Sequence, residues 1–310
     1  LAVSARSTAD TPTAENPSAW LGAFMGATAL GGRDKLTLIT SPLVASFGLW
    51  VEQLIAESTG KNMKGIVPIV GEPILDPSLY GDDRLFIYIR LEADSNDELD
   101  RHAIDIEKAG HEVIRIYLTD LYDIGSEFFR WKFATAIACS VIGVNPFDQP
   151  NVQISKDQTS YLLNEKLAGP PIGQGSLTDF LGYAESGDYL AIIGFLHQTA
   201  EIDYELSNFR KVITRNLGLP TTLGYGPRYL HSTGQLHKGG ANNGLFLQMF
   251  SDAIRIDIPG NNFTFGGLAN AQREGDYRAL VDLDRRVISI ELGPNVAMGI
   301  QKLSALVEGM

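Results

Sequence analysis

Apolar and polar residues follow one another in blocks along the chain, and these blocks predict alternating strands and helices. Most predicted strands are continuous apolar runs, which indicates a parallel sheet covered by helices on both faces, an α/β fold. The predicted strands are residues 35–40, 65–70, 84–90, 112–118, 188–196, 221–225, 244–250 and 287–292. The predicted helices are residues 20–29, 43–57, 94–109, 127–142, 202–217, 268–284 and 295–307.

Changes of composition divide the chain into a tail and two domains. Residues 1–16 are rich in Ser, Thr, Ala and Pro, which is typical of a linker or tail. Residues 165–177 contain several Gly and Pro residues and are the best candidate for a linker between domains. We therefore expect one α/β domain over residues 17–165 and a second over residues 166–310.

The composition limits the class of protein. Asp and Glu number 37 against 25 Lys and Arg, a formal net charge of −12, so the chain lacks the basic footprint of a nucleic-acid-binding protein. No apolar run reaches the ~20 residues that a membrane helix needs. The single cysteine, Cys139, excludes a disulfide within the chain and fits a cytoplasmic protein, and we interpret it as a small buried hydrophobic residue.

Three polar segments stand at the edges of apolar elements, at residues 57–61, 145–156 and 224–240. They supply a carboxylate in Glu57, an ammonium in Lys156 and an imidazole in His231. Desolvation at the end of a buried helix can raise the pKa of a carboxylate, and a histidine titrates near neutrality. Such a set fits a proton shift next to a carbonyl group.

The same side chains also have a structural interpretation. Glu57 fits a solvated charge at the end of a helix, Lys156 a surface lysine, and His231 a core histidine bonded to a backbone carbonyl. We expect no metal site, because His231 and His237 lie six residues apart without a carboxylate at ligand spacing. The chain has no Gly-rich dinucleotide loop, no phosphate-binding P-loop and no Gly-x-Ser-x-Gly elbow.

The three segments resemble motifs of the glucose-6-phosphate isomerase family. Residues 57–61, Glu-Ser-Thr-Gly-Lys, are similar to the catalytic glutamate segment, and residues 231–235, His-Ser-Thr-Gly-Gln, to the histidine segment. Residues 147–156 resemble the Phe-Asp-Gln-x-Gly-Val-Glu-x-x-Lys signature. Because the histidine segment follows the lysine segment, the order is most like the C-terminal isomerase part of bifunctional transaldolase/glucose-6-phosphate isomerases. The resemblance implies the sugar-isomerase (SIS) α/β fold.

The resemblance also implies a role for each matched residue. Glu57 would move the proton between C1 and C2 of the sugar phosphate through a cis-enediol, and Lys156 and His231 would assist ring opening. The implied substrate-binding residues are Gln149, Ser58, Thr59, Gly60, Lys61 and Gln235. The implied protein is a homodimer with a shared active site, without metal or organic cofactor, and it serves glycolysis and gluconeogenesis in the cytoplasm.

Some features depart from the family pattern. Asn151 and Gln153 replace the glycine and glutamate of the signature. The family's Ser-Lys-[Ser/Thr]-Gly-Thr-Thr phosphate loop and its Gly-Gly-Arg-[Phe/Tyr]-Ser arginine are absent from this sequence; Arg33 follows two glycines, but we interpret it as a loop residue. Since the chain begins at Leu1, we expect it to be the downstream part of a longer polypeptide, whose upstream part supplies these groups and a transaldolase domain.

Two other functions stay open at this point. One is a sugar-phosphate-binding SIS module without catalysis, and the other is an α/β enzyme with a non-sugar substrate whose motifs match by chance. The combination of Glu57, Lys156 and His231 favours the isomerase, because a sensor needs no base. The missing phosphate loop favours an incomplete enzyme over a complete sensor.

Overall fold

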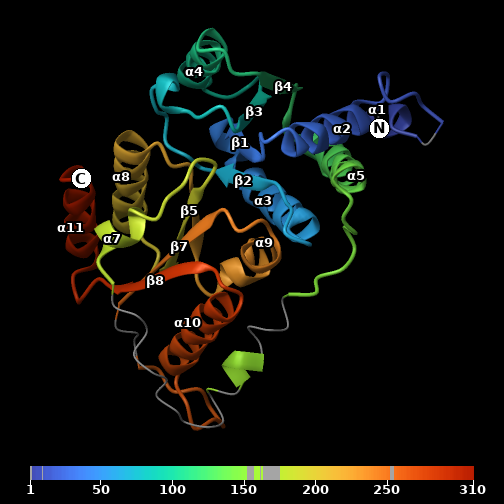
Figure 1. The fold of residues 1–310 in the computed structure, drawn as a ribbon. Coiled ribbons are helices and arrows are strands. Elements are labelled where there is room, and N and C mark those ends of the chain that lie inside the picture. Colours follow the sequence, from blue (N-terminus) through green and yellow to red (C-terminus); the bar gives the residue numbers. More distant parts are fainter. Residues whose placement is uncertain (1, 9, 152–156, 161, 163–174, 252–254) are drawn as a thin grey trace. The chain divides into compact units, whose positions relative to one another are not determined.

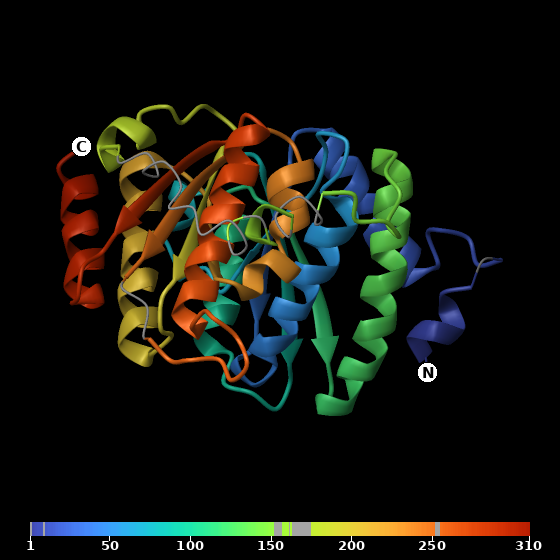
Figure 2. The ribbon, with the colours of Figure 1, turned by 90° about the horizontal axis from the view of Figure 1, so that it is seen from below.

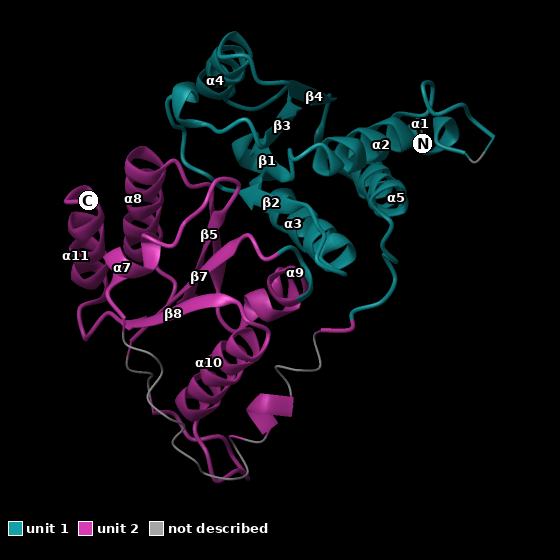
Figure 3. Cartoon of the chain, in the orientation of Figure 1, with its two compact units in different colours: residues 1–149, 239–241 teal, residues 150–238, 242–310 magenta. Residues whose placement is uncertain are grey.

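The chain forms two compact units (Figure 3). The computed structural model describes all residues except 1, 9, 152–156, 161, 163–174 and 252–254. Unit 1 comprises residues 1–149 and 239–241, and unit 2 comprises residues 150–238 and 242–310. The predicted domain boundary at residues 165/166 lies outside the described residues and stays a prediction.

Each unit is built around a four-stranded parallel sheet (Figures 1 and 2). The strand order is β2-β1-β3-β4 in unit 1 and β6-β5-β7-β8 in unit 2, and every pairing is parallel. The predicted α/β fold with parallel sheets is therefore confirmed. The strands are β1 (Lys35–Thr40), β2 (Val67–Val70), β3 (Arg84–Leu91), β4 (Val113–Leu118), β5 (Tyr189–Phe195), β6 (Thr221–Tyr225), β7 (Gly244–Phe250) and β8 (Arg286–Glu291).

Helices connect the strands and pack on the sheets (Figure 2). The sequence pattern does not predict α1, α7 and α9, because five or six residues are too few to display a helical period. The helix α1 lies within residues 1–16, for which the composition predicts a tail or linker. The predicted helices are all found, with shifted ends. The helices are α1 (Ala2–Arg6), α2 (Pro17–Leu30), α3 (Ala45–Thr59), α4 (Asp97–Lys108), α5 (Ile124–Ile142), α7 (Leu177–Leu181), α8 (Ala200–Leu217), α9 (Gly234–Gly239), α10 (Phe265–Asp282) and α11 (Val296–Glu308).

Burial on both faces explains the continuous apolar strands. In β3, Ile87 packs in a core that includes Trp131 of α5, whereas its neighbours Phe86 and Tyr88 pack in a second core with Ile106 of α4. Successive side chains of a strand point to opposite faces, so a strand buried on both faces must be apolar at every position. The same physical reason applies to the central strands of unit 2, where β5 and β7 are buried almost throughout.

Helices α2 and α5 of unit 1 lie side by side and approach each other closely at Gly22 (Figure 1). A Cβ atom at Gly22 would overlap the carbonyl oxygen of Ala134 and lie 2.8 Å from Cβ of Ile137. The N-terminus of α2 is capped by Asn16, whose Oδ1 accepts from the amides of Ser18 and Ala19. The absence of a side chain at Gly22 thus sets the spacing between the two helices.

We predict that Gly22→Ala lowers stability by about 1–3 kcal/mol, because the added methyl group forces α2 and α5 apart. The thermal unfolding midpoint measures the effect. Gly125→Ala is the matched control, since Gly125 also lies in a helix but has open space around its Cβ position. The control should be neutral or stabilising, because alanine has the higher helix propensity. Equal midpoints for the two variants would contradict the close approach.

Candidate active site

Glu57 lies in the last turn of α3, in unit 1, and its side chain is half-buried. Nε2 of Gln53, one turn earlier, donates to Oε2 of Glu57 at 3.2 Å. Phe47, Val51 and Ile55 of α3 are buried in the core, and the helix ends in the polar residues 57–59. This helix therefore presents a partly accessible carboxylate at its end, which is what a base needs; its role as a base stays a prediction.

The three residues after Glu57 end the helix and lead the chain into β2. The Thr59 hydroxyl donates to the carbonyl of Ile55 at 2.7 Å and accepts from the amide of Ile66 at 3.0 Å. Gly60 donates its amide to the carbonyl of Ala56 at 3.1 Å. Ser58 is buried, and its carbonyl accepts from the thiol of Cys139 at 3.4 Å. The side chain of Thr59 is thus engaged within the protein, and the predicted substrate contacts of these residues are untested.

Lys61 connects the glutamate segment to the Phe147-Asp148-Gln149 segment within unit 1. Its side chain is 3% exposed, and Nζ lies 3.0 Å from Oδ1 of Asp148 and donates to the carbonyl of Asn145. The hydrogen bond from Lys61 holds the pKa of Asp148 below its ordinary value. Two of the three sequence motifs are therefore joined by a direct ion pair.

A tight turn after Lys61 positions a second lysine, Lys64, against the C-terminus of α5. Asn62 and Met63 have positive φ angles of 55° and 59°, and Lys61 and Lys64 exchange backbone hydrogen bonds of 3.1 and 3.0 Å across them. Nζ of Lys64 donates to the carbonyl of Ile142 at 2.8 Å, at the C-terminus of α5. A cation is favourable there because the last carbonyls of a helix carry partial negative charge.

We predict that Lys61→Met loosens residues 145–149, because Asp148 and the Asn145 carbonyl then lose their common donor. Amide hydrogen exchange over residues 144–149 should become faster, while exchange in β1 and β3 stays unchanged. Lys132→Met is the control, since Lys132 is exposed on α5. Unchanged exchange over residues 144–149 in Lys61→Met would show that the ion pair does not order this segment.

His231 lies in unit 2, at the end of the short 3₁₀ turn Arg228–His231 that follows β6. Its side chain is exposed, whereas Thr233, Gln235, His237 and Lys238 directly after it are buried. The predicted alternative of a core histidine is therefore wrong for His231. An exposed imidazole on a short turn is accessible to a ligand, and a catalytic role stays a prediction.

A single buried carboxylate holds both ends of the segment that carries His231. Asp276 of α10 accepts from the hydroxyl of Tyr229 and lies 2.6 Å from Nζ of Lys238. Burial alone would raise the pKa of Asp276, but the Lys238 ammonium and the Tyr229 hydroxyl bring it below its ordinary value. Arg285 adds a 2.6 Å bond to the carbonyl of Lys238. Residues 229–238 are thus fixed to α10 at both ends.

Gln235 is fully buried and binds Asn151, which is also in unit 2. Its Oε1 accepts from the Asn151 amide at 3.0 Å, and its Nε2 donates to Oδ1 of Asn151 at 2.9 Å. Asn151 stands where the family signature has glycine, and this pair of hydrogen bonds gives the substitution a structural reason. The side-chain amide of Gln235 therefore holds Asn151, which lies within the motif of residues 147–156. The predicted contact of Gln235 with substrate is untested.

His237 is a buried, neutral histidine. Its ring centroid lies 4.9 Å from that of Phe246 and 5.8 Å from that of Tyr229. The pKa of His237 is lowered to about 3, mainly by burial and to a smaller extent by the neighbouring charge of Lys238. Nδ1 has no hydrogen-bond partner among the described residues. Protonation of this ring would place an unpaired charge in the core of unit 2.

We predict that His237 makes the protein less stable as the pH falls below about 6.5, the pKa of histidine in an unfolded chain. Because the pKa in the folded state is lower, the stabilisation is complete above about 6.5 and declines towards the folded pKa. Between about pH 7.5 and about pH 5 the loss is about 2 kcal/mol. Thermal midpoints at these two pH values should differ less in His237→Phe than in the unchanged protein.

The control for this measurement is His197→Gln, because His197 is an exposed histidine of the same unit. It should keep the full pH dependence of the unchanged protein. An equal pH dependence in His237→Phe and the unchanged protein would contradict a buried neutral imidazole at this position.

The other predicted residues have mixed outcomes. Gln149 is exposed and is the last residue of the main segment of unit 1. Lys156 and Gln153 lie outside the described residues. Glu57 belongs to unit 1 and His231 to unit 2, so each is described within its own unit. Arg33 lies in the loop between α2 and β1 and pairs with Glu112 at 2.7 Å, as predicted for a loop residue.

The described part of the chain gives no metal centre and no membrane helix. Among these residues, no group of three or more His, Cys, Asp or Glu side chains is placed to hold a metal ion. No described helix is both long and apolar enough to cross a membrane. Cys139 is fully buried, as predicted, and burial raises the pKa of its thiol to about 11. A thiol with so high a pKa is a poor nucleophile at neutral pH.

Sequence reasoning misses the residues that support these motifs. Asp148, Lys64 and Lys238 lie inside or next to the recognised segments, but a single sequence does not tell which of its polar residues contact substrate. Asp276 lies in α10, far from the motifs in sequence. The one sequence signal for Asp276 is that this carboxylate lies in a helix with few apolar residues available for burial.

Comparison with known proteins finds glucose-6-phosphate isomerases among the similar sequences. A probable glucose-6-phosphate isomerase of Methanococcus maripaludis is 27% identical over 158 residues, which cover 40% of this chain and 36% of that protein. The glucose-6-phosphate isomerase of Leptospira biflexa serovar Patoc is 26% identical over 181 residues, covering 46% and 39%. That of Onion yellows phytoplasma is 26% identical over 168 residues, covering 42% and 39%. The matched segments thus span less than two fifths of each relative.

Structural comparison is less informative. A hypothetical protein from Thermus thermophilus has a TM-score of 0.36 and 14% identity, and the match covers 99% of this chain and 86% of that protein. The C-terminal domain of glucosamine-fructose-6-phosphate aminotransferase from Francisella tularensis has a TM-score of 0.30 and 10% identity, covering 97% and 92%. TM-scores this low add nothing to the assignment of the fold, which rests on the two parallel sheets. No family model matches the chain. The chain is therefore similar to parts of glucose-6-phosphate isomerases, at low identity.

Proposed function

We propose that the chain carries an aldose–ketose isomerase site for glucose 6-phosphate and fructose 6-phosphate, with Glu57 as the base. The observation that carries this proposal is the Lys61–Asp148 ion pair. It joins the glutamate segment to the Phe-Asp-Gln segment, so two motifs that are distant in sequence act as one structural element within unit 1. If either motif matched the family by chance, there would be no reason to expect an ion pair between the two.

The proposed reaction needs only proton transfers. Glu57 takes the proton from C2 of the open-chain aldose, a cis-enediol forms, and the carboxyl group returns a proton to C1 while the hydroxyl proton passes from O2 to O1. No electron acceptor or cofactor is required, since the oxidation of C2 balances the reduction of C1. His231 and Lys156 are the proposed groups that move protons during ring opening.

The positions of Glu57 and His231 support their proposed roles. Glu57 is half-buried, so its carboxylate is held by the helix and still open to a ligand. His231 is exposed within residues 229–238, and Asp276 holds the two ends of this segment through Tyr229 and Lys238. Preorganised groups of this kind avoid reorganisation during the reaction. The binding of the substrate phosphate, the homodimer and an upstream transaldolase domain are part of the proposal by resemblance alone.

We predict that Glu57→Gln lowers turnover at least about a hundredfold, because the amide cannot accept the C2 proton. Formation of glucose 6-phosphate from fructose 6-phosphate, coupled to its dehydrogenase, measures the rate for the 310-residue chain. Glu98→Gln is the control, since Glu98 is an exposed carboxylate in the first turn of α4. Both variants should keep the circular dichroism spectrum and the unfolding midpoint of the unchanged chain.

Each outcome distinguishes one of the alternatives. Turnover that survives in Glu57→Gln would remove this residue from the role of base. A folded chain that binds glucose 6-phosphate in calorimetry without turnover would favour the non-catalytic sugar-phosphate-binding module. A folded chain that neither binds nor converts the sugar phosphate would show that this chain alone lacks a complete site.

A further inference from the structure

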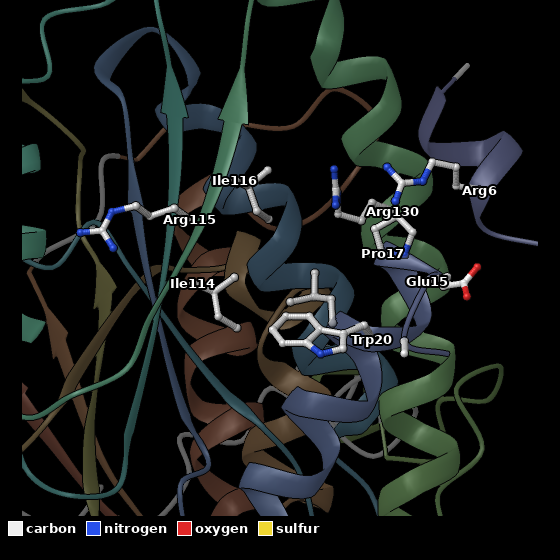
Figure 4. A pocket seen from close by; sticks show the side chains of 10 residues that line it. Arg6, Glu15, Pro17, Trp20, Ile114, Arg115, Ile116 and Arg130 are labelled. Carbon is white, nitrogen blue, oxygen red and sulfur yellow. The ribbon is translucent and has the colours of Figure 1, made fainter. Parts of the chain in front are cut away.

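Unit 1 contains a hollow that none of the three motifs lines. It has a volume of about 300 Å³ and lies against β4, α2 and the segment that precedes α2 (Figure 4). Small-molecule pockets are typically apolar with a few polar groups, and this volume is at the lower end of their range. The lining residues are Arg6, Ala14, Glu15, Pro17, Trp20, Leu21, Ile114, Arg115, Ile116 and Arg130.

The floor of the pocket is apolar. Ile114 and Ile116 point from the same face of β4 towards Trp20 of α2 (Figure 4). Trp20 is 43% exposed although it stacks on Phe24 with ring centroids 5.3 Å apart. A large aromatic ring that stays so exposed beside two isoleucines offers an apolar surface to a ligand.

Two guanidinium groups stand at one end of this floor. Arg6 points towards Arg130 in Figure 4, and both line the pocket. Nε of Arg130 donates to Oε1 of Glu127 at 2.9 Å, so that bond does not use the two terminal nitrogens. Arg115 differs, because it points away from the pocket to the opposite face of β4 and pairs with Glu107. The cationic end of the pocket is therefore made by Arg6 and Arg130.

The chain directly after Arg6 is held in place. The next residue, Ser7, is buried, and its hydroxyl lies 2.8 Å from that of Ser18 at the start of α2. Nδ2 of Asn16 donates to the carbonyl of Thr8 at 3.2 Å. These contacts fix the backbone beside Arg6 to α2. Arg6 is thus positioned next to the pocket, although it lies near the N-terminus of the chain.

We propose that this pocket binds an organic anion with an apolar body, its carboxylate or phosphate between Arg6 and Arg130 and its hydrocarbon part on Trp20, Ile114 and Ile116. Guanidinium groups suit both kinds of anion, because their planar N–H donors match two oxygens at once. Arg130 already pairs with Glu127 through Nε, so an anion between the two guanidinium groups would accept from the terminal nitrogens of Arg130 and from Arg6. The apolar floor excludes a small inorganic anion as the preferred ligand, since such an ion leaves the floor uncovered.

Calorimetric titration of the 310-residue chain with octanoate and with octyl phosphate tests the proposal. Octan-1-ol has the same hydrocarbon part without a charge, and acetate has the charge without the hydrocarbon part. We expect one site for octanoate or octyl phosphate, with much weaker binding of the other two compounds. Arg6→Gln and Arg130→Gln should each weaken binding about tenfold. Arg101→Gln, at an exposed arginine of α4, should leave it unchanged.

The outcomes separate clearly. Binding of either anion that depends on both arginines supports the site, and the tighter ligand identifies the headgroup. Equal binding of octan-1-ol, or equal affinity in Arg6→Gln, Arg130→Gln and the unchanged chain, overturns it. No binding of either anion to the folded chain also overturns it. Because no lining residue belongs to the three motifs, this result is independent of the isomerase activity.

Discussion

The buried ammonium group of Lys61 is the constraint on which the proposed active site depends. A lysine with so little exposure is costly unless it is paired, and Lys61 obtains both a carboxylate and a carbonyl from residues 145–148. This need for partners draws the end of α5 and the Phe-Asp-Gln segment to the end of α3. The same interaction that satisfies Lys61 therefore determines where Glu57 lies relative to Asp148. Lys61 therefore has a structural role that does not depend on any contact with substrate.

The fold was largely predictable from the sequence, and the supporting contacts of the site were not. Continuous apolar runs predict β3 and β5 because burial on both faces leaves a direct trace in the sequence. Motif resemblance finds Glu57 and His231. It does not find Asp276, because a carboxylate that binds Tyr229 and Lys238 is recognised only once α10 is folded beside them. Short elements such as α9 are equally hidden, since their formation depends on tertiary contacts.

The chain connectivity places Glu57 and His231 at opposite kinds of edge, each in the sheet of its own unit. In a parallel sheet, a helix that follows one strand returns to the edge where the next strand begins. α3 runs from β1 back to β2, so Glu57 lies at the amino edge of the unit 1 sheet. His231 instead follows the carboxyl end of β6 within a few residues. Ligands of open α/β sheets commonly bind at carboxyl ends. The position of Glu57 at the amino edge is the less usual one.

The two sheets have the same strand order. Each unit places its second strand outside its first and its third strand on the other side, and a fourth strand follows. The glutamate segment lies in unit 1 and the histidine segment in unit 2. Two units of the same topology thus carry different groups, and neither unit alone contains all the groups assigned to the reaction.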